Sequence, residues 1–255
     1  MANKCQSLVS HIVIPARLAS TRLPRKLLLR QTGKSLLHHT YEAASRATLP
    51  KGVCVAADHE EIAAEVRSFG GVVYMTSPAC ASGTDRIAEV ATHLPEADIL
   101  VNVQGDEPEL SGEAIDQVIQ LLECNSQASI ATLATPIRQR EKLLDPACVK
   151  VVFDAGGRAL YFSRAPIPHA REWNDGLLAV EPALFHQHLG LYAYRREYLI
   201  EFARRPRTPL EKLENLEQLR ALEHGDSIVV GTVDEPSIGI DTADDYREFV
   251  RRMAA

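Results

Sequence analysis

Apolar and polar positions alternate along the first half of the chain in a pattern of short strands followed by helices. Apolar runs that are typical of buried strands occupy residues 8–15, 52–57, 72–75 and 98–104. Apolar side chains recur at helical spacing over residues 35–47, 60–69, 83–94 and 111–123. Strands that alternate with helices in this way predict a mostly parallel sheet with helices on both faces.

The second half follows a less regular pattern. Residues 149–153 and 159–162 flank the sequence DAGG, which is typical of a hairpin turn. The proline-rich stretch 165–182 predicts a long loop, and 189–194 predicts a strand. Leucine at every third position over 210–222 predicts an amphipathic helical segment, and a strand at 228–233 and a helix at 242–253 follow. We predict a single domain over residues 1–255, with a less regular part around 145–225 that serves dimer contacts.

Composition narrows the choice of partners. The chain has 255 residues, of which 45% are hydrophobic and 24% charged, as in ordinary globular proteins. The formal net charge of −6 argues against nucleic acid as a partner. No apolar run reaches the length needed to span a bilayer, and the N-terminus lacks the apolar core of a signal peptide. We therefore expect a soluble, cytoplasmic protein without a membrane partner.

A basic loop follows the first predicted strand. It carries four cations and two hydroxyl groups, on Arg17, Ser20, Thr21, Arg22, Arg25 and Lys26. Ligands of open α/β sheets bind beyond the carboxyl ends of the strands, so this loop is expected to bind an anion such as a polyphosphate. The alternative is a loop whose charges are simply solvated.

Two acidic residues are placed to share a metal ion with such a polyphosphate. Asp106 follows the predicted strand 98–104, and Asp241 lies between a short apolar stretch and the last predicted helix. Mg²⁺ prefers hard oxygen ligands and is commonly held by one or two carboxylates together with phosphate oxygens. The alternatives are a solvated turn at Asp106 and a helix cap at Asp241.

The segment SGTDR at 82–86 precedes a predicted helix. Small residues such as Ser82 and Gly83 at a helix start allow backbone N–H groups to face a base or a phosphate. The alternative is an ordinary helix cap. The sequence GKS at 33–35 lacks the earlier glycine of a P-loop, and a dinucleotide fingerprint is absent.

Residues of the second half are candidates for binding the carboxylate and hydroxyl groups of a substrate. Arg164 follows a predicted strand and can grip a carboxylate through two parallel hydrogen bonds. His188 and Tyr192 share one face of a strand, and Glu217 and Gln218 interrupt the leucine pattern, where they can bind sugar hydroxyls. The alternatives are a structural histidine and a solvated helix face.

Seven motifs in this order resemble the 3-deoxy-manno-octulosonate cytidylyltransferase family, also called CMP-Kdo synthetases. The motifs cover essentially the whole chain: IPARLASTRLP (14–24), SGTDR (82–86), VNVQGDEP (101–108), ALYFSRAPIP (159–168), HLGLYAYR (188–195), LEQLR (216–220) and GIDTADD (239–245). One departure lies in the basic loop, which often reads RLPGKPL in the family and reads RLPRKLLL here, with Arg25 and Leu27 substituted.

The resemblance implies a nucleotide-diphospho-sugar transferase-like three-layer α/β sandwich with a mostly parallel, mixed central sheet. It implies a homodimer that uses Mg²⁺ to convert CTP and 3-deoxy-D-manno-octulosonate (Kdo) into CMP-Kdo and pyrophosphate for lipopolysaccharide biosynthesis. The part around 145–225 would then serve sugar binding as well as dimerisation. Two other interpretations stay open: an enzyme for another acid, such as a sialic acid or amino-Kdo, and a CTP-binding sensor without catalysis.

The resemblance also implies roles for individual residues. Lys26, Asp106 and Asp241 would be catalytic, and Asp106 and Asp241 would bind the metal. The CTP-binding residues would be Arg17, Lys26, Ser82, Gly83 and Asp106. The residues facing the sugar acid would be Gln104, Arg164, His188, Tyr192, Glu217 and Gln218.

Overall fold

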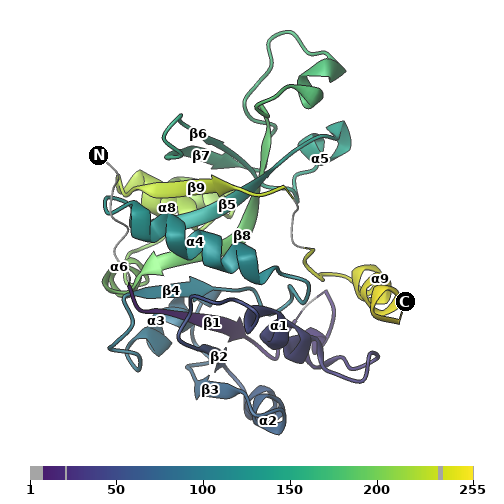
Figure 1. Cartoon of the computed structure of the whole chain (residues 1–255), viewed down its shortest axis with the longest axis vertical. Helices are drawn as coiled ribbons and strands as arrows, with labels where there is room; N and C mark the ends of the chain where they lie inside the picture. The colour runs from purple at the N-terminus through teal and green to yellow at the C-terminus, as the bar shows by residue number, and fades with distance from the viewer. Residues whose placement is uncertain (1–7, 21, 235–237, 255) are drawn as a thin grey trace.

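The computed structural model describes residues 8–20, 22–234 and 238–254. Within these ranges one nine-stranded sheet forms the centre, and helices lie on both of its faces (Figure 1). The strands are β1 (Ser10–Ala16), β2 (Val53–Ala57), β3 (Val72–Met75), β4 (Ile99–Asn102), β5 (Ile130–Pro136), β6 (Lys150–Phe153), β7 (Ala159–Ser163), β8 (His186–Arg195) and β9 (Ile228–Thr232).

The helices alternate with these strands in the first half and cluster in the second. The α-helices are α1 (Leu36–Ala44), α2 (Glu60–Ser68), α3 (Gly83–Ala91), α4 (Gly112–Cys124), α5 (Arg140–Leu144), α6 (Arg196–Phe202), α7 (Pro209–Glu214), α8 (Gln218–Glu223) and α9 (Ala243–Ala254). Two short 3₁₀ helices are η1 (Lys26–Leu28) and η2 (Asp175–Ala179).

The sheet is mixed, as the resemblance implies. Its strand order is β3-β2-β1-β4-β8-β5-β9, and β6 and β7 form a hairpin that pairs with β8. The four strands from β3 to β4 are parallel, whereas β8 runs antiparallel to both β4 and β5. Strand β9 is parallel to β5. The strand β8 therefore joins two parallel parts of the sheet.

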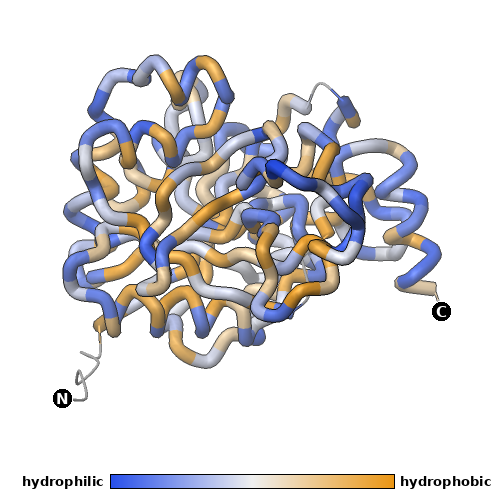
Figure 2. The backbone as a smooth tube through the Cα atoms, turned by 90° about the horizontal axis from the view of Figure 1, so that it is seen from above, coloured by the Kyte–Doolittle hydropathy of each residue, from blue (hydrophilic) through white to orange (hydrophobic). Residues whose placement is uncertain are grey.

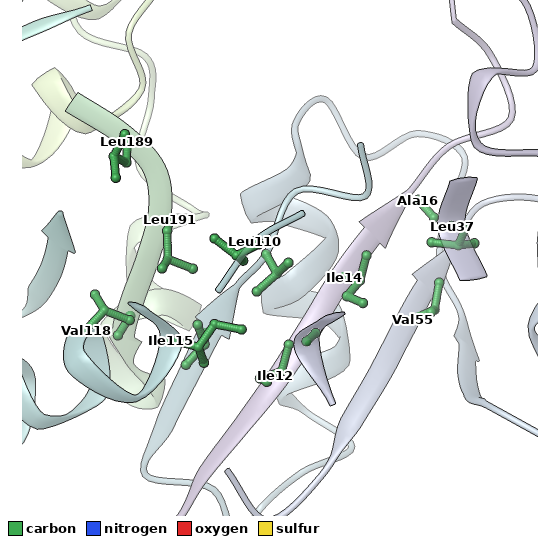
Figure 3. Packing of buried hydrophobic residues seen from close by; sticks show 14 of the residues in the cluster. Ile12, Ile14, Ala16, Leu37, Val55, Leu110, Ile115, Val118, Leu189 and Leu191 are labelled. Carbon is green, nitrogen blue, oxygen red and sulfur yellow. The ribbon is translucent and has the colours of Figure 1, made fainter. Parts of the chain in front are cut away.

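Two hydrophobic cores lie on opposite faces of the sheet. Ile12 and Ile14 of β1 pack into one core with residues of α1, α2, α4 and α9, whereas Val13 packs into the other core with residues of α3, α6 and α8. Side chains of a strand alternate between faces, so one strand supplies both cores. Figure 3 shows part of the first core, where Ile12 and Ile14 lie near Leu37 and Ile115. The arrangement confirms the three-layer prediction.

The predicted helical segment 210–222 is helical, but it is divided into two helices. Two short helices, α7 and α8, occupy it, and Asn215 between them has a left-handed backbone with φ 51°. Asparagine tolerates this conformation better than most residues, so it ends α7 although the leucine pattern continues. Strand β5 and the helices α5 and α6 were not predicted as separate elements. The predicted loop 165–182 contains η2.

A third, smaller hydrophobic cluster lies beside the sheet. Ile137, Leu143, Phe185 and Leu178 of η2 form part of it, and the segment that carries η2 extends beyond the sheet near α5 (Figure 1). The use of this part for dimerisation or sugar binding stays a prediction. No helix in the described ranges is both long and apolar enough to cross a membrane. Thr21 and the N-terminal residues 1–7, which entered the predictions above, lie outside these ranges.

Candidate functional site

A cavity of about 570 Å³ opens at the carboxyl ends of β1 and β4. Its size falls in the range of small-molecule binding sites. The lining residues come from four segments: Pro15, Ala16, Arg17, Ala19, Ser20, Arg22, Lys26 and Leu27; Cys80, Ala81, Ser82, Gly83 and Arg86; Gln104, Gly105, Asp106 and Glu107; and Gly239 and Asp241. The structure thus brings together all predicted CTP-binding and metal-binding residues, and Gln104 of the predicted sugar-binding set.

The basic loop is fixed at both ends. The carboxylate of Asp58, directly after β2, accepts a 2.9 Å hydrogen bond from the backbone N–H of Leu18. At the other end Arg25 has a left-handed backbone with φ 54°, after which η1 begins at Lys26. Arg17 is exposed, and among the described residues it forms no ion pair. Its guanidinium is therefore available to an anion in the cavity.

Lys26 lies between the two predicted metal-binding carboxylates. Its ammonium donates to Asp106 Oδ2 at 2.5 Å and to Asp241 Oδ1 at 3.1 Å, and Arg22 donates to the same Asp241 oxygen at 2.9 Å. The backbone N–H of Ile240 donates to the carbonyl oxygen of Asp106 at 2.9 Å. The two carboxylates are therefore held side by side, although Asp106 follows β4 and Asp241 precedes α9.

The donor chemistry of this pair fits Mg²⁺. Both groups are carboxylates, and a cation already lies between them in the form of the Lys26 ammonium. No group of three or more histidine, cysteine, aspartate or glutamate side chains in the described ranges is arranged to hold a metal by itself. A divalent ion at this pair would therefore need further oxygen ligands, which Mg²⁺ typically takes from substrate phosphates and water.

The start of α3 forms the opposite wall. Ser82 is its N-cap and forms a capping box with Asp85, so the predicted helix cap is present. Gly83 lies against Pro15, where an added Cβ would come within 3.3 Å of the proline ring. Glu217 accepts hydrogen bonds from Ser82 Oγ at 3.0 Å and Thr84 Oγ1 at 2.5 Å. Because Glu217 is largely buried, desolvation raises its pKa.

Glu217 therefore contacts the wall of the cavity without lining it. Through its two hydroxyl partners it connects the start of α8 to the start of α3. Its neighbour Gln218 is buried within α8. Sequence patterns did not indicate this contact, because it joins segments that lie far apart in the chain. The structure favours a positioning role for Glu217, and a direct contact with the sugar acid stays a prediction.

A second group of predicted residues lies on β8. His188 Nε2 and Thr132 Oγ1 share a hydrogen bond of 3.0 Å. The ring centroids of His188 and Tyr192 lie 5.2 Å apart. Gly190, between them on the same face, approaches Gln104 and Glu107 so closely that an added Cβ would lie 3.6 Å and 3.4 Å from their side chains. This face of β8 thus borders the cavity. Burial lowers the pKa of His188 to about 3, so the ring is neutral.

Arg164 is engaged by the backbone around it. Its guanidinium donates to the carbonyl oxygens of Glu214 at 2.8 Å and Pro146 at 3.0 Å, and its backbone N–H donates to the Glu214 carboxylate. The buried ammonium of Lys150 donates to the carbonyl oxygen of Arg164 at 2.6 Å. Arg164 does not line the cavity, and its predicted grip on a sugar carboxylate would require these bonds to be exchanged.

Several residues that line the cavity have no role predicted from the sequence, and Arg86 is the one with the most polar contacts among them. Arg86 of SGTDR lines the cavity and is buried, with its guanidinium donating to Thr76 Oγ1 at 2.6 Å and lying 3.7 Å from Asp58. An arginine in the first turns of a helix is usually exposed to solvent, so the sequence pattern did not indicate that Arg86 is buried in the site. Here Arg86 links α3 to the segments after β2 and β3.

Comparisons with known proteins identify the family to which the chain is similar. A sequence profile described as "Cytidylyltransferase" matches residues 11–228. The chain is 54% identical to a 3-deoxy-manno-octulosonate cytidylyltransferase of Rhodopirellula baltica, over 95% of this chain and 97% of that protein. It is 46% identical to the protein of the same name from Geobacter metallireducens, over 95% and 96% of the two chains.

Solved structures extend the likeness to three dimensions. A CMP:2-keto-3-deoxy-manno-octonic acid synthetase in complex with CTP superposes with a TM-score of 0.88 at 38% identity, covering 96% of this chain and 98% of that one. A 4-diphosphocytidyl-2C-methyl-D-erythritol synthase from Anaerococcus prevotii superposes with a TM-score of 0.63 at 13% identity, which shows a shared fold alone. By its sequence and its fold, the chain belongs to the 3-deoxy-manno-octulosonate cytidylyltransferase family.

Proposed function

We propose that the protein transfers CMP from CTP to the anomeric 2-hydroxyl of Kdo, giving CMP-Kdo and pyrophosphate for lipopolysaccharide biosynthesis. The names of the relatives, which match over nearly the full length of both chains, support this reaction. A structural neighbour of 38% identity that was solved with CTP supports CTP as the nucleotide.

One observation carries the proposal. A single cavity contains both a set of cations and a pair of carboxylates, at the ends of two neighbouring parallel strands. The cations Arg17, Arg22 and Lys26 suit a triphosphate, and Asp106 and Asp241 suit the ion that accompanies it. A simple anion-binding pocket would have no use for the carboxylates.

The reaction we propose is an in-line attack of the sugar hydroxyl on the α-phosphorus, with pyrophosphate as the leaving group. Such a transfer depends on positioning and on charge neutralisation more than on a covalent nucleophile. Arg17 and Lys26 would hold the phosphates and offset the charge that develops on them. Ser82 and Gly83 would bind the cytosine, and the β8 face with His188 and Tyr192 would support the sugar.

We also propose that Mg²⁺ is the metal and that Asp106 and Asp241 hold it. When bound there, Mg²⁺ would neutralise phosphate charge and fix the triphosphate in the cavity. A homodimer and a cytoplasmic location are further parts of the proposal. They rest on the family, of which such properties are typical.

The first test is pyrophosphate release from CTP and Mg²⁺ in the presence of Kdo, 8-amino-Kdo or N-acetylneuraminate in parallel. Release with Kdo is the expected result. Release with another acid would keep the reaction and change the substrate. Binding of CTP without release in any reaction would favour a sensor over an enzyme.

The second test is Asp106→Asn, which keeps the shape of the side chain and removes its charge. We expect kcat to fall by at least ~10²-fold, the scale of a single electrostatic contribution to catalysis. Asp244→Asn is the matched control, because Asp244 is exposed on α9 and pairs only with the exposed Arg247 among the described residues. Near-normal turnover of Asp106→Asn would remove this carboxylate from the mechanism.

A further inference from the structure

The Lys26 ammonium occupies the space between the two carboxylates that suit a divalent ion. We infer that Lys26 is a resident cation that keeps this pair closed to divalent metals until a nucleotide enters the cavity. The phosphates of the nucleotide then draw the ammonium away and open the pair to the incoming ion. The inference deepens the proposed function and rests on it for the nucleotide and for the carboxylate pair that binds the metal.

The contacts of Lys26 support this role. Its ammonium is within hydrogen-bond distance of both carboxylates, at 2.5 Å from Asp106 and 3.1 Å from Asp241. The residue is only 8% exposed, and its backbone is held in η1 by a hydrogen bond from its N–H to the carbonyl oxygen of Leu23. The backbone of Lys26 is therefore held beside the carboxylates, and only its side chain needs to move when the ammonium exchanges partners.

The charges of the site give the physical reason. Two carboxylates face two cations, since Arg22 also donates to Asp241 at 2.9 Å. Each carboxylate of the pair therefore already has a cationic partner, and a divalent ion entering this arrangement would lie close to the Lys26 ammonium. At short distances in a partly buried site such repulsion opposes the binding of the ion, because little water is present to screen it. Metal alone therefore binds weakly while Lys26 stays in place.

A triphosphate changes this balance. Its oxygens offer Lys26 alternative acceptors in the same cavity, and its charge offsets that of the divalent ion. The ammonium can then exchange one set of anionic partners for another without becoming unpaired, which would be costly for a buried charge. Because coupling between two ligands is reciprocal, the metal also strengthens nucleotide binding. The two then bind as one unit.

The test measures metal binding in the absence of nucleotide and sugar. Mn²⁺ is used as the probe, and free Mn²⁺ is followed by electron paramagnetic resonance during titration of the full-length protein. We expect Lys26→Met to bind Mn²⁺ at least ~10-fold more tightly than the unchanged protein. Adding Asp106→Asn to Lys26→Met should abolish the gain, which would assign it to this carboxylate pair.

Lys34→Met is the matched control. Lys34 donates to both oxygens of Glu42 at 2.6 Å and 2.8 Å, but the pair is exposed and lies outside the cavity. We expect the Mn²⁺ affinity of Lys34→Met to equal that of the unchanged protein. The inference would be overturned if Lys26→Met and the unchanged protein bound Mn²⁺ with equal affinity. It would also be overturned if the unchanged protein bound Mn²⁺ tightly in the absence of nucleotide.

Lys26→Gln covers the case in which Lys26→Met fails to fold, because the glutamine amide can still donate to one carboxylate. It should also bind Mn²⁺ more tightly, and added Mn²⁺ should raise its Tm more than that of the unchanged protein. No Tm difference together with unchanged Mn²⁺ affinity would overturn the inference. These titrations contain no CTP or Kdo, so a failure of the proposed reaction would be seen separately, in the pyrophosphate assay.

Discussion

The backbone N–H of Ile240 donates a 2.9 Å hydrogen bond to the carbonyl oxygen of Asp106. This bond holds the segment before α9 against the segment after β4, so each carboxylate reaches the same ammonium. The docking of α9 supports the contact, because Phe249 is buried in the core and the hydroxyl of Tyr246 accepts a hydrogen bond from the backbone of Gln31. Figure 2 shows α9 at one edge of the molecule, mostly hydrophilic with a few hydrophobic positions.

Phe249→Ala should therefore affect both stability and the site. Truncation of a buried phenylalanine lowers the free energy of unfolding by about 3–5 kcal/mol. A loosened α9 would also move Asp241 away from Asp106, so we expect kcat to fall in protein that circular dichroism shows to be folded. Met253→Ala, an exposed position on the same helix, is the control and should change neither. Full activity of folded Phe249→Ala would show that α9 does not position Asp241.

Glu217→Gln separates two roles for this residue. If Glu217 positions Ser82 and Thr84, loss of its charge should raise KM for CTP by about tenfold, equivalent to ~1.4 kcal/mol, and leave KM for Kdo nearly unchanged. A rise confined to KM for Kdo would instead support the direct sugar contact predicted from sequence. Glu197→Gln, at an exposed glutamate of α6, is the control and should change neither constant.

Arg25 provides a test of backbone strain next to the site. Its φ of 54° is unfavourable for a residue with a Cβ by about 1–2 kcal/mol, and glycine adopts it freely. Arg25→Ala and Arg25→Gly both lose the exposed ion pair with Glu61. Because only glycine relieves the strain, we expect Arg25→Gly to be more stable than Arg25→Ala by about 1 kcal/mol in urea unfolding. Equal stability of the two variants would contradict the left-handed conformation.

His188 should make stability depend on pH. Its pKa of about 3 in the folded chain lies below the ordinary value of 6.5, so between these values the unfolded chain binds more protons. Stability is therefore unaffected by His188 above pH 6.5 and falls as the pH drops below it. At pH 4.5 the loss is about 2–3 kcal/mol. His188→Gln should remove this part of the pH dependence of urea unfolding.

A second measurement on the same residue uses NMR. The ring signals of His188 should not shift between pH 5 and pH 9, because the ring stays neutral throughout. Burial beside the rings of Phe162 and Tyr192 removes the water that would stabilise the charged ring. A titration step near pH 6.5 would show that the ring is open to water.

Sequence patterns predicted those parts of the fold that depend on local periodicity. The strand 72–75 agrees with β3 at both ends, and Ser35, Ser82 and Ser111 cap the helices expected to start there. The pairing of Asp106 with the basic loop was also predictable, because neighbouring parallel strands end at the same edge of the sheet. The carboxyl ends of β1 and β4 meet this condition.

Contacts between segments that are distant in the sequence could not be predicted from local patterns. The leucine repeat continues through Asn215, so it gave no sign that α7 ends there. Sequence spacing also does not predict the hydrogen bonds of Glu217 to Ser82 and Thr84, or those of Arg164 to backbone carbonyls. These bonds depend on how separate segments pack. The roles of single residues in the second half of the chain therefore depend on the tests above more strongly than the roles of residues in the first half do.

The position of β8 also has a kinetic consequence. Its pairing with β4 joins Ile99 to Arg195, so the sheet is completed only when a loop of nearly a hundred residues closes. Closing a flexible loop of that length costs about 4 kcal/mol of chain entropy. Contacts so distant in sequence form slowly, whereas β1, β2 and β3 pair over shorter separations. A refolding chain should therefore regain much of its secondary structure before it regains the ability to bind a nucleotide.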